Sequence, residues 1–116
     1  MDIESLRELC LSFPGATEDM KWGEHLCFCV REKMFLITGL DDKPIGASFK
    51  VSDEDFDEMA TRDGCIPAPY MARNKWVKVD DIARWSAKEW KEVASNSYNL
   101  IRSKLPKKVQ AELENA

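Results

Sequence analysis

The chain has 116 residues, of which 44% are hydrophobic and 33% charged, and its net charge is −4. This balance excludes a disordered, highly charged tail and allows one hydrophobic core but not two, so we expect a single folded domain over residues 1–116. No run approaches the about 20 apolar residues of a membrane span, and the acidic start "MDIESLRELC" is unlike an export signal. We expect a cytoplasmic protein with no membrane partner, and favour a monomer.

The first segment predicts an amphipathic helix. Asp2 can cap its start and Pro14-Gly15 can end it. Its apolar residues recur at helical spacing: Ile3, Leu6, Cys10 and Phe13. The next stretch, "GATEDMKWGE", has no clear period, so we predict an ordered crossing loop that is anchored by Trp22.

An antiparallel meander is predicted next. Residues 25–30 alternate, with Leu26, Phe28 and Val30 on one face, and "REK" turns the chain into the apolar run "MFLITGL". A second short turn, "DDKP", leads into "IGASFKV". Turns this short join antiparallel neighbours, so these three strands form the core of the sheet.

Helices and a fourth strand follow the meander. Ser52 and Asp55 predict the capped start of a helix that ends at Gly64, and "KWVKV" predicts a partly exposed strand. Ser86 and Glu89 form a capping box for a long helix whose apolar stripe contains Trp90, Val93, Ala94, Ser97, Tyr98, Ile101 and Leu105. Pro106 ends this helix and can start a last one, "PKKVQAELE".

No catalytic constellation is found, so we expect no enzyme, cofactor or metal. The four cysteines are predicted to be buried small hydrophobes in a reducing compartment, since there is no CxxC pair and only one histidine to complete a zinc site. His25 lacks an obvious nucleophile as partner. The acid clusters at 41–42 and 53–58 fit a hairpin turn and a helix start, where carboxylates are favourable for structural reasons.

Positive charge is segregated along the chain. Residues 1–72 carry 7 Lys+Arg against 15 Asp+Glu, whereas residues 73–108 carry 10 against 4. Aromatic residues interleaved with cations can stack on bases while the cations meet phosphates, although a tryptophan at a strand start can equally plug the core. The candidate nucleic-acid residues are Arg73, Asn74, Lys75, Trp76, Lys78, Lys107 and Lys108.

Tyr70 is a candidate anchor for a partner or for its own loop. Pro67 and Pro69 restrict the backbone before it, so its side chain is delivered in a defined direction.

Four pieces resemble the MmcQ/YjbR-like family of small bacterial proteins: "FPGATEDMKWGE", "FCVREKMFLI", "PAPYMARNKWVKV" and "SYNLIRSKLPKKVQAEL". They stand in the family's order and cover nearly the whole chain. The resemblance implies an α+β fold of the CyaY-like kind, an antiparallel sheet packed by N-terminal and C-terminal helices. It also implies a "double-wing" DNA-binding role, although the hairpin tips "REK" and "DDKP", which would be the wings, are mixed or acidic in charge.

Three functions remain open. The first is a non-enzymatic module that binds nucleic acid weakly, in a salt-dependent way, through the basic 73–108 region. The second is a protein-interaction or adaptor module that uses the exposed sheet face or the loop at 66–72. The third is a small-molecule binder, which requires a deep apolar pocket.

Overall fold

The structure, a computed structural model, describes residues 1–114. Its helices and strands follow in the order α1 (Ile3–Leu11), β1 (Ala16–Lys21), β2 (His25–Val30), β3 (Lys33–Gly39), β4 (Gly46–Lys50), α2 (Phe56–Ala60), β5 (Cys65–Pro67), the 3₁₀ turn η1 (Ala72–Asn74), β6 (Trp76–Val79), the 3₁₀ turn η2 (Ile82–Arg84), α3 (Ala87–Arg102) and α4 (Lys107–Glu114).

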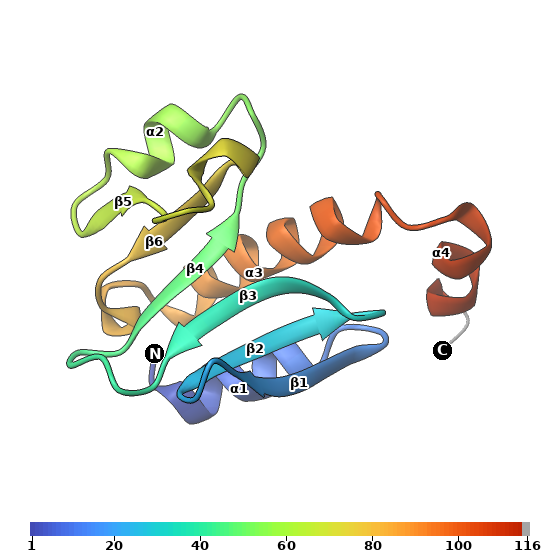
Figure 1. Cartoon of the computed structure of the whole chain (residues 1–116), viewed down its shortest axis with the longest axis horizontal. Helices are drawn as coiled ribbons and strands as arrows, with labels where there is room; N and C mark the ends of the chain where they lie inside the picture. The colour runs from blue at the N-terminus through green and yellow to red at the C-terminus, as the bar shows by residue number, and fades with distance from the viewer. Residues whose placement is uncertain (115–116) are drawn as a thin grey trace.

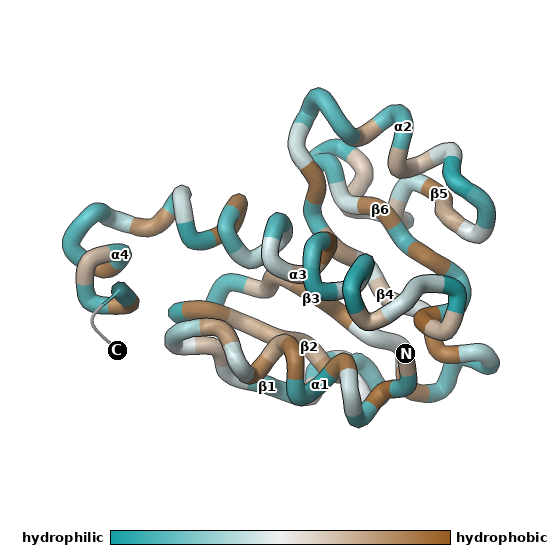
Figure 2. The backbone as a smooth tube through the Cα atoms, turned by 180° about the vertical axis from the view of Figure 1, so that it is seen from behind, coloured by the Kyte–Doolittle hydropathy of each residue, from teal (hydrophilic) through white to brown (hydrophobic). Residues whose placement is uncertain are grey.

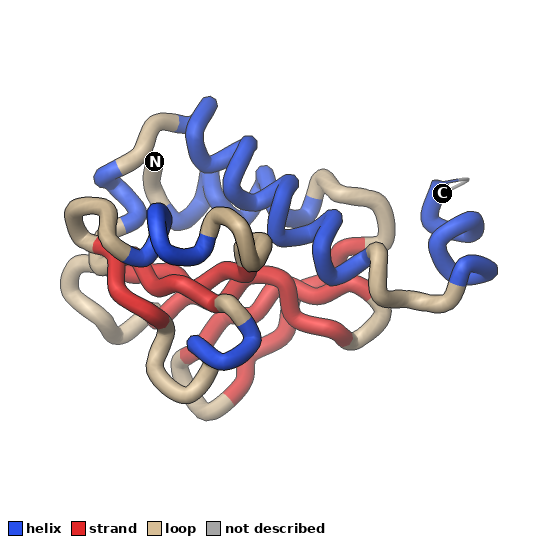
Figure 3. Tube along the Cα trace, turned by 90° about the horizontal axis from the view of Figure 1, so that it is seen from above, coloured by secondary structure: helices blue, strands red, loops and turns tan. Residues whose placement is uncertain are grey.

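The six strands form one antiparallel sheet in the order β1-β2-β3-β4-β6-β5. Helices α1 and α3 lie together on one face of this sheet, and α4 lies beyond the end of α3 (Figures 1 and 3). The predicted α+β class, the three-stranded meander and the fourth strand are all confirmed. Among residues 1–114 no helix has the length and the hydrophobicity to span a bilayer.

The main core lies between the sheet and helices α1 and α3. Phe28, Leu36, Phe49 and Val77 are paired across four neighbouring strands, so they share the face that α3 covers. Trp90 fills the space above them and donates a 2.8 Å hydrogen bond from its indole N–H to the carbonyl oxygen of Ile82. Figure 2 shows hydrophobic stretches along the strands and hydrophilic ones around α2.

The opposite face of the sheet carries a smaller apolar cluster. Cys27, Cys29, Ile37 and Trp76 point to this side, and Ala68 packs against them from the loop before η1. Three backbone hydrogen bonds hold that loop to the sheet: Ala68 N to Trp76 O at 2.9 Å, Trp76 N to Met71 O at 3.3 Å and Val51 N to Lys75 O at 2.9 Å. Residues 68–75 therefore form an ordered cover over one end of this face.

Two strands replace what the sequence predicted as loop. The segment "ATEDMK" is the edge strand β1, and Trp22 lies exposed in the turn after it instead of anchoring a crossing loop. The prediction was wrong because the inward position of β1 is occupied by Glu18, which pairs with Arg7 of α1 and removes the apolar alternation. Cys65–Pro67 forms the other edge strand, β5, which is too short to show a pattern.

Two of the three predicted helix starts are confirmed. Asp2 accepts a hydrogen bond from Ser5 N at 2.8 Å, and Ser86 accepts one from Glu89 N at 3.2 Å. Ser52 caps a turn through Asp55 N at 3.2 Å, but regular helix begins only at Phe56. The helix α3 ends at Arg102, before Pro106, and α4 then packs its buried Leu113 against Gly15.

Candidate functional site: a groove lined by lysines

An open groove of about 530 Å³ lies at the end of the sheet where η1 and the C-terminal end of α3 approach each other. Its polar residues are Lys33, Lys50, Asn74 and Lys104. Its apolar residues are Met34, Met71, Trp76, Ile101 and Leu105. No carboxylate lines it within the described chain. We call this feature the lysine groove.

Strand pairing sets Lys50 in the groove. Lys50 closes β4 directly opposite Trp76 of β6, so both side chains stand on the face that residues 68–75 cover. Its backbone N–H donates a 2.9 Å hydrogen bond to Ser97 Oγ, and that hydroxyl donates to Phe35 O at 2.5 Å. The strand end is thereby fixed to α3, and the Lys50 side chain has one defined direction.

Lys50 is a buried residue whose ammonium group bonds to a backbone carbonyl and to no carboxylate of the described chain. The residue is only 8% exposed, and its Nζ donates a hydrogen bond to the backbone carbonyl of Asn74. Burial lowers the pKa of this amine below its ordinary value of 10.5; Lys104 and Lys75 lower it further, and only Asp53 acts to raise it. No ion pair joins Lys50 to an acid anywhere in residues 1–114.

Trp76 lies in the core. It is 5% exposed and packs with Cys27, Cys29 and Ile37. Of the two roles considered for it, stacking on a base or filling the core, the structure therefore fits the second. The suggestion that Trp76 stacks on a base does not fit this burial. The residue instead contributes an edge of apolar surface to the groove.

Three predicted cationic or polar residues do come together at η1. Arg73 is exposed, Asn74 lines the groove, and Lys75 follows in the left-handed conformation at φ 65°. The ammonium group of Lys75 lies 4.9 Å from the ring centroid of Phe56, which holds the side chain over α2. Arg73 and Lys75 thus flank the groove.

Lys78, Lys107 and Lys108 lie outside the groove. Lys78 stands two residues further along β6, and its Nζ is 3.8 Å from a carboxylate oxygen of Asp42, which compensates its charge. Lys107 and Lys108 are exposed at the start of α4, shortly after Leu105, which does line the groove.

Tyr70 is fully exposed and makes no contact with the core. Its backbone sits at φ 65°, a conformation that bulky residues seldom adopt. The side chain is therefore presented to solvent by a loop that the neighbouring backbone hydrogen bonds hold in place.

Lys33, Lys50 and Lys104 were not among the candidate residues from the sequence, although Lys33 belongs to the tip "REK" and Lys104 to the basic 73–108 region. Lys33 opens β3, Lys50 closes β4, and Lys104 follows α3, so 71 positions separate the first from the last and no local motif joins them. The one sequence feature that could have pointed to this groove is Lys50, a lysine inside the otherwise largely apolar run "IGASFKV". Its meaning depends on the pairing of β4 with β6.

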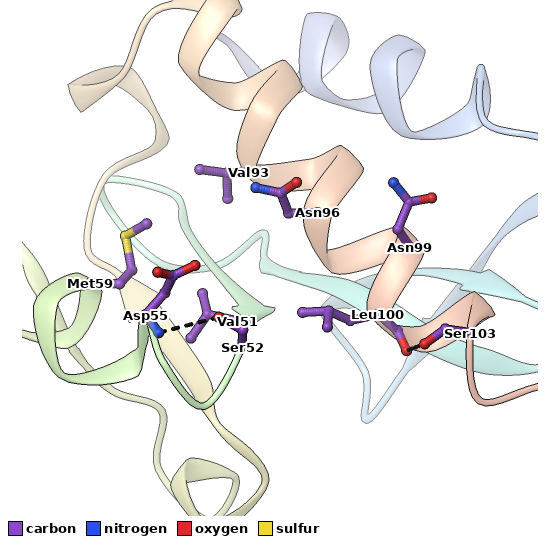
Figure 4. Close-up of a pocket in the computed structure, with 9 residues that line it drawn as sticks. All are labelled: Val51, Ser52, Asp55, Met59, Val93, Asn96, Asn99, Leu100 and Ser103. Carbon is purple, nitrogen blue, oxygen red and sulfur yellow. Dashed lines mark hydrogen bonds between the residues drawn. The ribbon is translucent and has the colours of Figure 1, made fainter.

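A second groove, of about 450 Å³, lies between α2 and α3 (Figure 4). Asn96, Asn99 and Ser103 approach it from α3, with Asp55 on the opposite side, over an apolar base that includes Val51 and Leu100. These groups suit hydrogen bonds to a neutral polar molecule. The groove contains none of the lysines that distinguish the first.

The cysteines do not form a reactive site. All four are buried and unpaired, and burial raises the pKa of Cys10 to about 12 and that of Cys27 to about 11. His25 is exposed at the start of β2, with its ring 5.9 Å from that of Trp22. The Cys27 thiol donates a 3.8 Å hydrogen bond to the backbone carbonyl of His25, and in the described part of the chain no nucleophile is hydrogen-bonded to its imidazole ring.

Fold and groove together define a small α+β protein with a lysine-lined groove at one end of an antiparallel sheet. The model of the YjbR family matches residues 11–100, and the chain belongs to this family. The family resemblance of the four sequence pieces is thus confirmed.

Two solved structures are similar over most of the chain. A Deinococcus radiodurans protein with a DUF419 domain has a TM-score of 0.85 at 26% identity, over 97% of this chain and 87% of that one. A protein from Pseudomonas syringae has a TM-score of 0.71 at 17% identity, over 86% of this chain and 98% of that one, which is a likeness of fold alone. No curated protein matches the chain.

Proposed function

We propose that the protein is a non-enzymatic nucleic-acid-binding module whose contact surface is the lysine groove with its flanking cations. The observation that carries the proposal is the convergence of Lys33, Lys50 and Lys104 in a groove without a carboxylate. Such a surface attracts phosphate and repels acidic proteins, even though the whole chain is acidic.

The cations outside the groove extend this surface. Arg73 and Lys75 stand on one side, and Lys107 and Lys108 follow the Lys104 turn on the other. None of these four forms an ion pair within residues 1–114, whereas Arg7, Arg31, Arg62, Arg84 and Arg102 each do. Lys21, Lys43, Lys88 and Lys91 are also without an ion pair in the described chain and lie elsewhere, so the groove and the start of α4 hold most, but not all, of the unpaired positive charge.

This proposal centres the contact on the groove, which includes Lys33 of the β2–β3 tip, and not on the other tip residues of a double-wing arrangement. Arg31, at the tip of the β2–β3 hairpin, is paired with Glu112 of α4 at 3.1 Å, and Asp42 in the β3–β4 turn is paired with Lys78. Tips whose charges are already paired contribute little to phosphate binding.

Fluorescence anisotropy with labelled single-stranded and double-stranded oligonucleotides tests the proposal. We expect weak binding that falls steeply with salt, and a salt slope reduced by about one for each of Arg73→Glu and Lys104→Glu. The matched control is Lys88→Glu or Lys91→Glu: both lysines are exposed on the first turns of α3, and Lys88 lies about 20 Å along the helix from the groove. Absence of binding at low salt, or an equal loss in the control variants, contradicts the proposal.

An adaptor function is the second candidate, and the specific observation that favours it is Tyr70. A fully exposed tyrosine at positive φ adds nothing to the core, and strained, exposed residues often mark a contact site. We expect Tyr70→Ser to leave the free energy of unfolding unchanged and to abolish stoichiometric binding of one identified partner protein. Equal binding by the variant removes this candidate.

A further inference from the structure

Lys50 is buried without a carboxylate partner among the described residues. A lysine residue that is only 8% exposed normally has a carboxylate partner, because an unpaired buried charge is costly. Here its partners are one backbone carbonyl oxygen and, close by, the like charge of Lys104. The folded protein therefore keeps the buried Lys50 close to the exposed Lys104 in a groove that no carboxylate of the described chain lines, although Asp53, outside that lining, acts on Lys50.

An anion bound beside Lys50 would offset the cost of burying its charge and also the repulsion between Lys50 and Lys104. It would pair with the buried ammonium of Lys50 and separate its charge from that of Lys104, while Lys33 adds a third cation at the opening of β3. A phosphate monoester carries a charge of about −1.5 to −2 near neutral pH, whereas a phosphodiester carries only one negative charge. Two or three converging lysines without an acid match the monoester better.

The buried position of Lys50 also favours a phosphate at the end of a strand over a phosphate within it. A monoester has one covalent attachment, so it can reach a buried ammonium while its carrier stays outside. A diester within a strand would have to bring both neighbouring sugars down to the level of Lys50.

The rest of the groove suits an organic carrier. Met34, Met71, Ile101 and Leu105 supply apolar walls, and the flexible thioethers of the two methionines adapt to flat groups. Its volume of about 530 Å³ lies within the usual range for small-molecule sites.

We propose that the lysine groove is a site for a phosphate monoester on a nucleoside-sized carrier, with the phosphate held between the ammonium groups of Lys50 and Lys104. The inference rests on the proposed function for its natural source, which is the phosphorylated end of a nucleic-acid strand. A free mononucleotide is the other source of the same chemical group.

Isothermal titration calorimetry with four probes distinguishes these sources. The probes are an oligothymidylate with a terminal phosphate monoester, the same strand without it, thymidine monophosphate and inorganic phosphate. We expect the phosphorylated strand to bind about tenfold or more tightly than the plain strand, as one charge-assisted contact allows. The preference is lost in Lys50→Met and in Lys104→Met, and retained in Lys88→Met.

Lys104 is exposed, so its variant keeps the test valid even where Lys50→Met fails to fold. Equal affinity for the two strands overturns the monoester site and leaves the proposed function standing. Binding of thymidine monophosphate that depends on Lys104, with no binding of either strand, supports the monoester site and overturns the proposed function. If inorganic phosphate binds as tightly as thymidine monophosphate, the groove does not recognise the carrier. If none of the four probes binds, both proposals are overturned.

Discussion

The ammonium group of Lys50 donates a hydrogen bond to the backbone carbonyl oxygen of Asn74 and so joins the end of β4 to the wall of the lysine groove. The backbone N–H of the same residue is held by Ser97 of α3. One residue thus connects the sheet, the long helix and the η1 loop. The position of the groove depends on these two contacts.

Ser97→Ala tests the contact between the helix and the strand. Ser97 is fully buried, and its loss leaves the N–H of Lys50 and the carbonyl of Phe35 without a partner. We expect the free energy of unfolding to fall by about 1–3 kcal/mol. Urea unfolding measures this, with Ser95→Ala as a control on the same helix; equal stability of the two variants contradicts the contact.

Lys50→Met tests the charge in the groove through pH. Because the folded pKa of Lys50 lies below its ordinary value of 10.5, the unfolded chain binds more protons between these two values, and this residue makes stability rise with pH across that window. The thiols act in the opposite sense, since the pKa of Cys10 rises from 9.0 to about 12 on folding.

The difference between the wild-type protein and the Lys50→Met variant cancels the thiol contribution. We expect the stability of the wild type to gain on that of the variant as pH rises toward 10.5, by denaturant unfolding at each pH. A constant difference would show that Lys50 titrates in the folded protein as it does in the unfolded chain.

Gly15→Ala tests how α4 is attached. A Cβ atom at Gly15 would come within 2.3 Å of Leu113 Cδ2, whereas at Gly23 it meets nothing within 4 Å. Both glycines have positive φ, so Gly23→Ala carries the same backbone strain without the clash. We expect Gly15→Ala to lose more stability and to release α4 to proteolysis; equal effects in the two variants refute the Leu113 contact.

Because the cysteine thiols are buried, we expect them to react slowly with thiol reagents in the folded protein. Cys10 and Cys27 have raised pKa values and no exposed sulfur, so we expect a chromogenic disulfide reagent to react only as fast as the protein opens. The rate in native buffer is compared with that in denaturant. Rapid reaction of either thiol in the native state is incompatible with this burial.

Much of the fold follows from local sequence signals. Ser86 and Glu89 begin the long helix, and its stripe from Trp90 to Tyr98 is the buried one. Residues 25–30 alternate as the strand requires, with Phe28 and Cys27 in separate clusters. Where an edge strand turned a charged residue inward, as β1 does with Glu18, the local pattern gave no indication of a strand.

The site could be predicted only in part. The segment from Arg73 to Lys75 does flank the groove, but Trp76 lies in the core and Lys78 is paired with Asp42. The lysines that make the groove cationic lie on separate strands and beyond a helix. Their convergence is a property of strand register and helix packing, which a single sequence does not display.

The most direct test of the anion-binding groove is chemical-shift mapping of backbone amides during titration with the phosphorylated oligothymidylate. We expect salt-sensitive shifts that concentrate at Lys33, Lys50, Asn74 and Lys104 and are lost in Lys104→Met. Shifts that concentrate instead on the β3–β4 turn or on the groove between α2 and α3, or the same shifts in Lys104→Met, would contradict the anion-binding groove.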